Sequence, residues 1–240
     1  MSDEKYTYDY PKADITTDAV IFGIDPGTHE LMVLLVRRGR EGEPFFGSWA
    51  LPGGFLGMDE GIEDGLRREI REECGIELPF VEQLGTFGDV GRDPRGRVVT
   101  VAHLALVRPE TLEVVAGDDA AEAAWFDVIQ VVGWDNPRLA FDHRGIVDTA
   151  LTRLRSKMPW HPVGMELLPE EFTLTELQRV YETVLNGSLD TRNFRRRLLS
   201  YGVLVELDKL RKTGGKPAQL YRFDEERYQK LREQGLDFEV

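Results

Sequence analysis

The sequence has little cysteine and histidine, with Cys74 as its one cysteine and four histidines among 240 residues. One thiol cannot form an internal disulfide bond, and these scattered residues lack the spacing of a zinc site. Long apolar runs are also missing. No stretch approaches the roughly 18 residues that a membrane-spanning helix needs, and residues 1–10 are acidic and aromatic rather than basic and apolar. We therefore expect a protein of the reducing cytoplasm with no membrane span and no secretion signal.

Charge is distributed unevenly along the chain. The net charge of −13 argues against a uniformly basic nucleic-acid binder. Residues 157–240 hold 14 Lys and Arg against 14 Asp and Glu, so the whole −13 belongs to residues 1–156. Within residues 186–223, nine basic residues face three acidic ones. At 41% hydrophobic residues, a chain of this length is expected to fold into two globular domains, the second carrying a local basic surface.

Strand-like and helix-like segments alternate in the first two thirds of the chain. The turn Asp25-Pro26-Gly27 separates two apolar segments, which predicts a hairpin. With further strands and a closing helix, this order predicts an α/β domain over residues 1–156. The expected strands are Asp18–Ile24, Leu31–Arg37, Val81–Phe87, Val98–Val107 and Ala123–Phe126, and the expected closing helix is Phe141–Arg155.

A charged segment, residues 60–74, is expected to form a helix of about four turns. Its apolar residues recur at every fourth position, which indicates one buried stripe. Asp59 is expected to cap its start, and Gly75 suits the left-handed position after its end. The residues expected in the core are Ile62, Leu66 and Ile70, with Cys74 as a further packing residue.

The last third of the chain follows a linker expected at residues 157–171. Thr173 and Glu176 form a capping-box pattern that opens one helix, and Asp190 is placed to cap a second helix, Thr191–Ser200. Two strands, Val203–Leu207 and Gln219–Phe223, come next. The order helix, turn, helix, hairpin predicts a winged helix-turn-helix domain over residues 172–240.

The charged helix contains a spaced pattern of glutamates. Glu69, Glu72 and Glu73 stand at positions i, i+3 and i+4, so they share one helix face and repel one another unless a cation neutralises them. Oxygen ligands that leave room for water and phosphate oxygens suit Mg²⁺ or Mn²⁺. A solvated surface helix is the alternative, but it would leave this repulsion uncompensated. The pattern therefore favours a divalent metal site that binds a diphosphate.

The whole pattern, from Gly54 through Glu60 to the run Arg68–Ile76, resembles the complete signature of the Nudix hydrolases. This resemblance implies an α/β/α sandwich with a mixed sheet and a metal-dependent pyrophosphohydrolase activity. It also implies that Glu69, Glu72 and Glu73 ligate the metal. By the same resemblance, Arg68 orients the carboxylates, Glu60 supports the site and Gly54 permits the turn before the helix.

An acidic domain that binds a polyanion needs cations besides the metal. Arginine suits this task because its planar guanidinium binds phosphate oxygens in pairs. An ordinary surface salt bridge is the alternative for each candidate. The expected ligand-binding residues are Arg37, Arg38, Arg92, Arg95 and Arg97.

The second helix of the expected helix-turn-helix motif is strongly basic. This helix enters the major groove in such motifs, and basic residues of a wing can follow the phosphate backbone. Thr191 and Asn193 lie near the helix start, where side chains contact base edges. The expected DNA-binding residues are Thr191, Arg192, Asn193, Arg195, Arg196, Arg197, Lys212 and Lys216.

The combination of both domains resembles the Nudix-related transcriptional regulators of NAD metabolism. Residues 172–182, 193–196, 215–221, 140–144 and 91–96 carry this resemblance. It implies a homodimer that represses genes of NAD or related sugar metabolism and leaves double-stranded operator DNA when ADP-ribose or a similar nucleotide binds. Many such regulators have an eroded signature, whereas this one is intact, so we also expect hydrolysis.

A second hypothesis retains the metal helix and assigns the chain to metabolism. In this interpretation the protein is a magnesium-dependent ADP-ribose pyrophosphatase, and its C-terminal domain serves dimerisation or protein interaction alone. The two hypotheses differ in what the arginines of the second domain bind.

Overall fold

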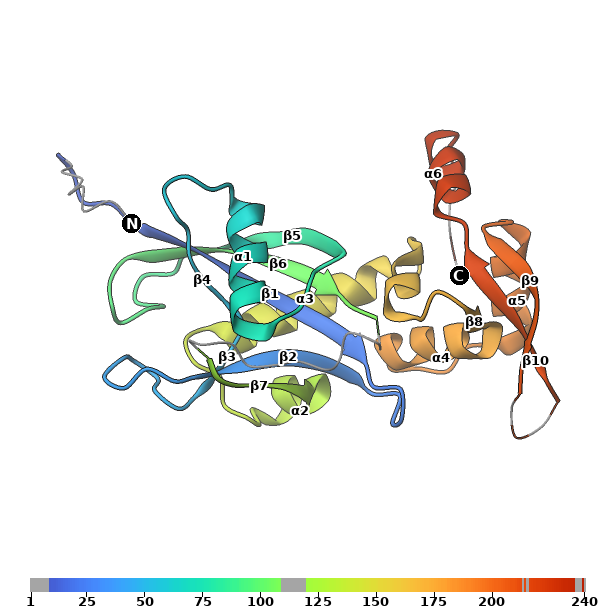
Figure 1. The fold of residues 1–240 in the computed structure, drawn as a ribbon, viewed down its shortest axis with the longest axis horizontal. Coiled ribbons are helices and arrows are strands. Elements are labelled where there is room, and N and C mark those ends of the chain that lie inside the picture. The colour runs from blue at the N-terminus through green and yellow to red at the C-terminus, as the bar shows by residue number, and fades with distance from the viewer. Residues whose placement is uncertain (1–8, 109–119, 213, 215, 236–238, 240) are drawn as a thin grey trace.

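The fold was analysed in a computed structural model, which describes residues 9–108, 120–212, 214, 216–235 and 239 (Figure 1). Thr213 and Gly215 of the expected wing and residues 1–8 of the acidic start lie outside these ranges. An N-terminal domain built on one large sheet and a smaller C-terminal domain follow one another along the long axis of the molecule (Figure 1).

A mixed seven-stranded sheet forms the centre of the N-terminal domain. The long strand β1 pairs in parallel with β6 and antiparallel with β2 and β4, and β7 and β3 both pair with β2. Strand β5 pairs with β6 at the other edge. The strands are β1 Asp14–Ile24, β2 Leu31–Arg38, β3 Trp49–Ala50, β4 Gly53–Phe55, β5 Phe80–Phe87, β6 Val98–Leu106 and β7 Ala120–Asp127.

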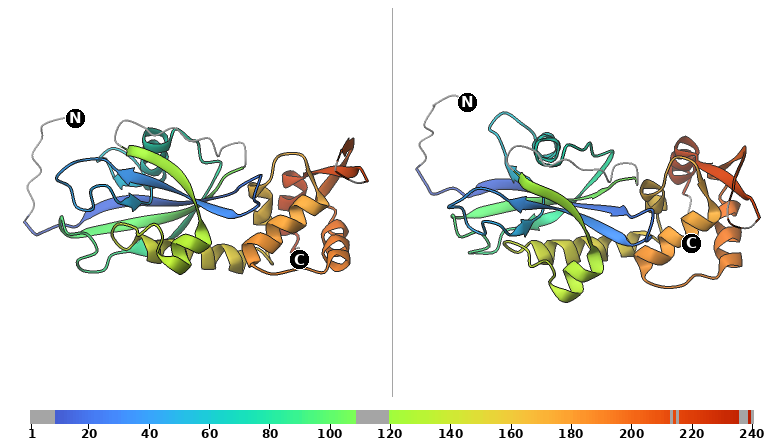
Figure 2. Two further views of the ribbon diagram at one scale, coloured as in Figure 1. Left: turned by 90° about the horizontal axis from the view of Figure 1, so that it is seen from below. Right: turned by 60° about the horizontal axis from the view of Figure 1, so that its bottom comes forward.

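Helices cover both faces of this sheet, which confirms the expected α/β/α sandwich (Figure 2). Helix α1 (Ile62–Cys74) packs on one face, where alternate strand residues such as Ile21 and Leu34 are fully buried. Helices α2 (Val128–Trp134) and α3 (His143–Lys157) pack on the other face against Phe22 and Leu35. Because both faces are buried there, the second half of β1, residues 19–24, is a continuous apolar run rather than an alternating one.

Helix α1 differs from expectation at its start. It begins at Ile62 after Gly61, with no side-chain cap, so the expected cap by Asp59 is wrong. Ile62 is 42% exposed and therefore does not belong to the core as expected. Burial on this helix begins one turn later, at Gly65, which packs so closely that an added Cβ would lie 2.5 Å from Leu56. Leu66, Ile70 and Cys74 are buried, and Gly75 adopts the expected left-handed conformation with φ 68°.

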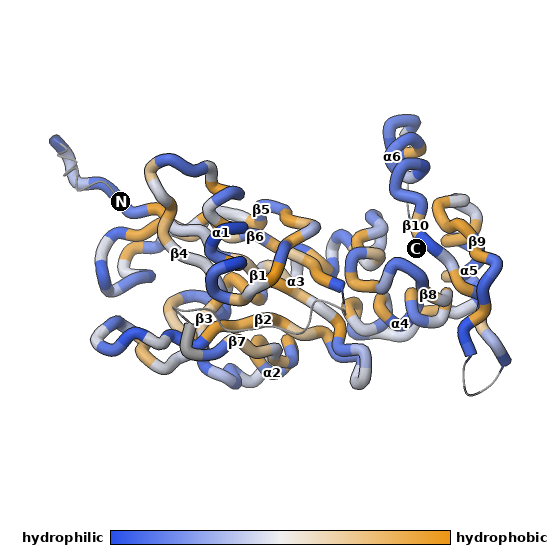
Figure 3. Tube along the Cα trace, viewed as in Figure 1, coloured by the Kyte–Doolittle hydropathy of each residue, from blue (hydrophilic) through white to orange (hydrophobic). Residues whose placement is uncertain are grey.

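The C-terminal domain has the predicted helix, turn, helix, hairpin order. Thr173 and Glu176 form both hydrogen bonds of the capping box, and the Asp190 side chain accepts from the Asn193 N–H. A last helix that the sequence analysis did not predict is almost uniformly hydrophilic (Figure 3). The elements are the 3₁₀ helix η2 Pro162–Leu167, β8 Phe172–Thr173, α4 Leu174–Leu185, α5 Thr191–Ser200, β9 Leu204–Arg211, β10 Ala218–Phe223 and α6 Glu225–Glu233.

The segment expected to be a linker, residues 157–171, is packed rather than open. Met165, Leu167 and Leu168 are buried in the same cluster as Leu154 of α3 and Tyr181 of α4. The prolines interrupt the helix, but the apolar residues between them bring the chain back onto the core. One hydrophobic cluster thus continues from the first domain into the second.

Among the described residues, no helix has the length and apolar character needed to cross a membrane.

We predict that Leu154→Ala destabilises the protein by about 2–5 kcal/mol, because the fully buried side chain leaves a cavity at the junction of the two domains. Denaturant unfolding followed by fluorescence measures the change. Leu210→Ala is the matched control, since Leu210 is 63% exposed and its truncation should change stability by less than about 0.5 kcal/mol. Equal losses in both variants would contradict the shared core.

Candidate functional site

A pocket of about 350 Å³ opens beside the first half of strand β1. Strand β1, the loop between β2 and β3, strand β4 and helix α1 form one part of its wall. The loop 88–97 and the start of α3 form the rest. Its polar lining residues include Thr16, Asp18, Arg37, Arg38, Arg40, Glu43, Arg68, Glu69, Glu72, Glu73, Arg92, Asp93, Arg95 and His143.

Arg68 lies at the centre of the glutamates on α1. Its Nη1 atom donates to Glu69 Oε1 at 2.8 Å and to Glu72 Oε2 at 3.1 Å. Its Nε and Nη2 atoms donate to the two carboxylate oxygens of Glu60 at 3.0 and 2.7 Å. The structure therefore brings Arg68 together with three of the four signature glutamates, as an orienting role requires.

Glu73 lies apart from this guanidinium. Its Oε2 atom accepts a hydrogen bond from the Gly53 N–H at 2.9 Å. Burial raises the pKa of Glu73 to about 8, and the negative charges of Glu69 and Asp18 add to the effect. Burial also raises the pKa of Glu69, although its hydrogen bond with Arg68 opposes the shift. The inner end of the carboxylate face thus lacks positive charge.

Two glycines allow the backbone to approach these carboxylates. A Cβ atom on Gly54 would lie 2.6 Å from the carboxylate of Glu69. Gly53 has φ +145°, and a Cβ there would lie 2.1 Å from the Thr17 carbonyl oxygen. Both positions therefore require glycine if β4 is to pair with β1 and still leave room for Glu69.

The donor set of this face fits a hard divalent cation. Glu69, Glu72 and Glu73 offer carboxylate oxygens, the ligands that Mg²⁺ and Mn²⁺ prefer. In the described part of the chain, no group of three or more acidic, histidine or cysteine residues already surrounds a common point. The reason is visible in the contacts of Arg68, which holds Glu69 and Glu72 while Glu73 turns to Gly53.

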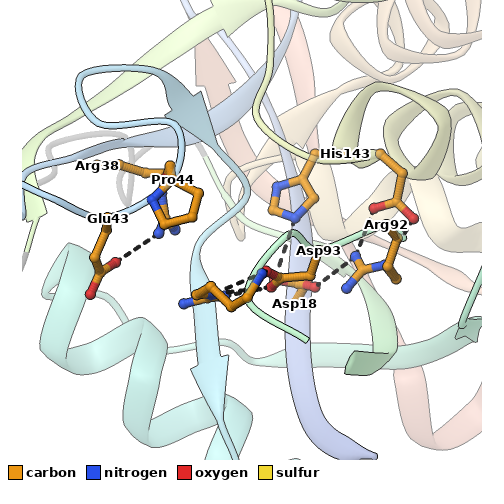
Figure 4. A network of polar contacts seen from close by, with 9 residues as sticks. Asp18, Arg38, Glu43, Pro44, Arg92, Asp93 and His143 are labelled. Carbon is orange, nitrogen blue, oxygen red and sulfur yellow. Dashed lines mark hydrogen bonds and ion pairs between the residues drawn. The ribbon is translucent and has the colours of Figure 1, made fainter. Parts of the chain in front are cut away.

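The wall opposite α1 contains a buried polar network (Figure 4). Arg92, whose side chain is 4% exposed, donates to both carboxylate oxygens of Asp142 at 2.9 and 2.7 Å and lies 4.0 Å from Asp18. His143 Nδ1 accepts from the Leu51 N–H at 2.8 Å, and burial lowers the pKa of this imidazole. Neutral His143 and charged Arg92 therefore hold the start of α3 against β1.

Two further arginines lie close to one aromatic ring. The guanidinium of Arg38 lies 4.9 Å from the centroid of Phe141, and that of Arg95 lies 5.5 Å from it. Arg38 donates to Glu43 at 2.8 Å, and Arg95 donates to buried Asp93 at 2.7 Å. Burial lowers the pKa of Arg38, and the nearby Arg95 lowers it further. Two like charges that face one pocket favour an anionic ligand.

The five predicted ligand arginines are thus placed differently. Arg37, Arg38, Arg92 and Arg95 line the pocket, but Arg92 is committed to Asp142. Arg97 is not among the lining residues and donates to the carbonyls of loop residues 88 and 89. Sequence reasoning missed several pocket residues because they lie outside the glutamate motif, although two of the short runs that carried the family resemblance contain some of them. The missed residues are Asp18, Gly53, Asp93, Phe141, Asp142 and His143.

Helix α5 presents an exposed basic surface at the far end of the molecule. Arg192, Arg196 and Arg197 are exposed, and the Arg196 side chain donates to Asn193 Oδ1 at 3.0 Å. Arg197 also lies 3.3 Å from Glu239. Phe194 and Leu198 are buried beneath this surface. The geometry suits contacts with a phosphate backbone.

Four other expected DNA contacts are placed differently. Arg195 turns back toward α4, where its Nη2 donates to Thr175 at 2.9 Å and its Nε is buried without a partner. The spacing from buried Phe194 and Leu198 predicts an outward direction for Arg195, but this residue borders the buried face, three positions before Leu198, and packs toward α4. Thr191 accepts from Gln178 Nε2 at 3.0 Å. Lys212 and Lys216 are exposed at the wing.

The fold and the two sites define a ligand-pocket domain joined to a winged helix domain. Two family models match these parts: the NUDIX domain over residues 15–150 and the NrtR DNA-binding winged helix domain over residues 164–223. The chain belongs to the Nudix family, in the group of NrtR regulators that carry this winged helix domain.

Similar proteins support this assignment. An "ADPR responsive transcriptional repressor NtrR" of Acinetobacter baylyi is 37% identical over 90% of this chain and 84% of its own length. Shewanella oneidensis NrtR in complex with a 27mer DNA superposes with a TM-score of 0.77, at 35% identity, covering 87% of this chain and 93% of that one.

Two further similarities concern the N-terminal domain. The Nudix domain of Shewanella oneidensis NrtR, solved with ADP ribose, has a TM-score of 0.51 and 33% identity, covering 61% of this chain and 94% of its own. An ADP-ribose pyrophosphatase of Methanocaldococcus jannaschii is 41% identical over 48% of this chain and 63% of its own length. The chain therefore belongs to a hydrolase family whose members generally use divalent metal ions.

We predict that Glu73→Gln stabilises the metal-free protein at pH above 8. The folded-state pKa of Glu73 is raised, so this carboxyl group lowers stability progressively as pH rises from about 4.5 to about 8. Removing it should increase the free energy of unfolding by about 1 kcal/mol or more at pH 8.5 and by much less at pH 4.5. Thermal unfolding at both pH values measures this difference. Exposed Glu77→Gln is the control, and a loss of stability at pH 8.5 would contradict the prediction.

Proposed function

We propose that this protein represses genes by binding double-stranded operator DNA through α5 and the wing, and that ADP-ribose bound in the N-terminal pocket controls this binding. The observation that carries the proposal is the presence, in one chain, of a pocket lined by Arg38 and Arg95 and of a separate exposed arginine surface on α5. The relatives from Acinetobacter and Shewanella, which match both domains, support it. We further propose that the regulated genes serve NAD or related sugar metabolism.

The pocket chemistry supports a nucleoside diphosphate sugar as the ligand. Arg38 and Arg95 both face the pocket, and each uses part of its guanidinium to bind an acidic residue. A pyrophosphate can bind the other nitrogen atoms or replace Glu43 and Asp93 as partners. Phe141 holds the two guanidiniums in place through its ring faces. The Nudix domain of Shewanella NrtR with ADP ribose supports the same class of ligand.

We propose that Mg²⁺ or Mn²⁺ is held by Glu69, Glu72 and Glu73. When bound, the ion neutralises the carboxylates and polarises a phosphoryl group of the ligand. Arg68 keeps Glu69 and Glu72 on the pocket side of α1, while Glu60 fixes Arg68 from the loop. The hydrogen bond from Arg68 lowers the pKa of Glu60 to about 2, so Glu60 remains an anionic anchor for this arginine at neutral pH.

We also propose that the domain hydrolyses ADP-ribose, because the signature is complete and Glu69, Glu72, Glu73, Arg68 and Gly54 all line one pocket. An enzyme that removes its own effector would return the DNA-binding domain to its ligand-free state. The similarity to a Methanocaldococcus pyrophosphatase favours hydrolysis. It also supports a second candidate function, in which the chain is a metabolic hydrolase.

Hydrolysis is tested with Glu72→Gln combined with Glu73→Gln. We expect the double variant to lose at least about 100-fold of the Mg²⁺-dependent rate of AMP formation from ADP-ribose, since two of the three carboxylates are neutralised. Circular dichroism should show an unchanged fold. Glu77→Gln, on the same side of the domain but paired with Arg71, is the control and should retain activity. Metal-dependent turnover in the double variant would contradict the assignment of the site.

DNA binding requires a second copy of the chain if the operator is two-fold symmetric, as in many helix-turn-helix regulators. We therefore propose a homodimer that works in the cytoplasm with the DNA. Exposed Arg192 and Arg196 are the residues of α5 best placed for phosphate contacts. Arg195 has a positioning role instead, because it bonds to α4.

We predict that Arg192→Ala with Arg196→Ala weakens binding to the DNA upstream of the gene and flattens its salt dependence. Loss of two phosphate contacts should reduce the slope of log K against log salt by about 2 per subunit. Fluorescence anisotropy between 50 and 200 mM salt measures this slope. Arg71→Ala removes an equally exposed arginine of the N-terminal domain and should leave binding unchanged. An unaltered slope in the double variant would assign the phosphate contacts to other residues.

One experiment separates the two candidate functions. Promoter DNA bound to the protein is titrated with ADP-ribose with and without Mg²⁺. Release or tightening of the DNA supports the regulator, and turnover with no DNA binding at low salt supports the metabolic hydrolase.

A further inference from the structure

The turn between β1 and β2 reaches from the N-terminal domain to helix α4 of the winged helix domain (Figure 1). The Thr183 hydroxyl donates to the His29 carbonyl oxygen at 3.0 Å. Arg179 Nη1 donates to His29 Nε2 at 2.8 Å, so the ring nitrogen is the acceptor. His29 has φ 63°, and Asp25 folds the turn by accepting from the N–H groups of Gly27 and Thr28. The folded turn therefore holds His29 against α4.

The same strand that ends in this turn passes the ligand pocket. Thr16 and Asp18 of β1 line the pocket, and the next residues, 19–22, are fully buried in the sheet. Asp18 and Asp25 are seven residues apart, which is about 23 Å along a strand. Over this distance β1 pairs with β6 as far as Phe22 and with β2 from Phe22 to Ile24, and residues 19–22 are fully buried, so the strand is held along its length. A shift at Asp18 is therefore carried to His29.

Helix α3 connects the two domains by a second route. His143 at its start lines the pocket, and Arg155 near its end donates to the Val184 carbonyl oxygen at 2.8 Å. Leu154 and Met158 are buried in the cluster that includes Tyr181 of α4. This connection is covalent and packed, so it persists in any arrangement of the folded protein. It ties the C-terminal end of α4 to α3.

A hollow of about 230 Å³ lies between the β1–β2 turn and α4. Ile24, Pro26 and His29 of the turn form one side, and residues of α4 and of segment 167–169 form the other. The turn thus meets α4 through the polar contacts of His29 beside open space and is not embedded in close packing. Such a contact can change without opening the core.

The DNA-reading helix follows the position of α4. Tyr181 of α4 packs edge to face on Phe194 of α5 with ring centroids 5.3 Å apart, and both side chains are buried. Gln178 of α4 also bonds to Thr191 at the start of α5. A change in the orientation of α4 therefore moves the exposed arginines of α5 as one body.

We propose that the hydrogen bonds of His29 with Thr183 and Arg179, called the His29 contact below, couple the ligand pocket to the DNA-binding domain. This proposal rests on the proposed function. Ligand bound beside Asp18 displaces β1 relative to α3, the turn changes its contact with α4, and α5 changes its orientation. Coupling between two sites commonly amounts to about 5- to 150-fold in affinity, a range that two hydrogen bonds can supply.

The test uses His29→Asn combined with Thr183→Val in the full chain. Asparagine tolerates the left-handed backbone but lacks the imidazole acceptor, and valine keeps the shape of threonine without its hydroxyl. The matched control is Thr149→Val on α3, which removes a hydroxyl that donates at 2.8 Å to a carbonyl away from the junction. For each protein, the DNA dissociation constant is measured with and without ADP-ribose.

We expect ADP-ribose to change DNA affinity by the same factor in the wild type and in Thr149→Val. In the double variant this factor should fall at least about threefold, while DNA affinity without ADP-ribose and ADP-ribose affinity without DNA each stay within about twofold. If ADP-ribose changes DNA affinity by the same factor in the double variant as in the wild type, the proposed role of the His29 contact is overturned. If the wild type binds DNA with no response to ADP-ribose, the regulatory part of the proposed function fails. A second measurement then tests the His29 contact directly.

That measurement is the distance between dyes at Gln130→Cys on α2 and Glu226→Cys on α6, in labelled protein diluted with unlabelled protein. Native Cys74 is buried and does not compete for the label. ADP-ribose should shift the distance distribution of the wild type, and the double variant should show a broader distribution that does not shift. A wild-type distribution that ADP-ribose leaves unchanged, or a double variant identical to the wild type, would overturn the proposal.

Discussion

The concentration of carboxylates on one partly buried helix face is the constraint on which the rest of this structure depends. Arg68 neutralises part of that charge by binding Glu60, Glu69 and Glu72 at once. Glu73 remains without a cationic side chain within bonding distance, and burial raises its pKa. The fold maintains this unfavourable arrangement through two glycines that bring β4 against the helix. A site that costs stability in this way is suited to bind a cation together with an anionic ligand.

The opposite wall of the pocket supplies the complementary charge. Arg38 and Arg95 lie close to Phe141, and each forms an ion pair with an acidic neighbour, Glu43 and Asp93 respectively. Asp142 and His143 belong to the same wall and begin the helix that leads to the second domain. The pocket wall and the connection to the winged helix domain therefore use adjacent residues, and one hydrophobic core continues across residues 157–171 on that side.

Much of this arrangement was predictable because it is local in sequence. The capping box at Thr173, the cap at Asp190, the left-handed Gly75 and the glutamate face of α1 all depend on residues within one or two helical turns. The α/β class and the winged helix order followed from patterns of the same short range, whereas the α/β/α layers were implied by the resemblance to the Nudix hydrolases. Predictions failed at Asp59 and Ile62, where local propensity does not reveal that helix–sheet packing begins at Gly65, and at Arg195, whose direction depends on contact with α4.

The sequence by itself determined the helix with the glutamate face and the basic helix, because each is a periodic pattern along the chain. It also placed them in two domains, because charge and the order of elements change along the chain. Tertiary structure alone decided which arginines face the pocket. Arg92 is paired with Asp142, 50 positions away, and Arg97 is turned to its own loop. It also decided that His29 meets Thr183, 154 positions away, and that the expected linker is buried. Such contacts join segments whose separation in sequence carries no periodic signal, so only the folded chain defines them.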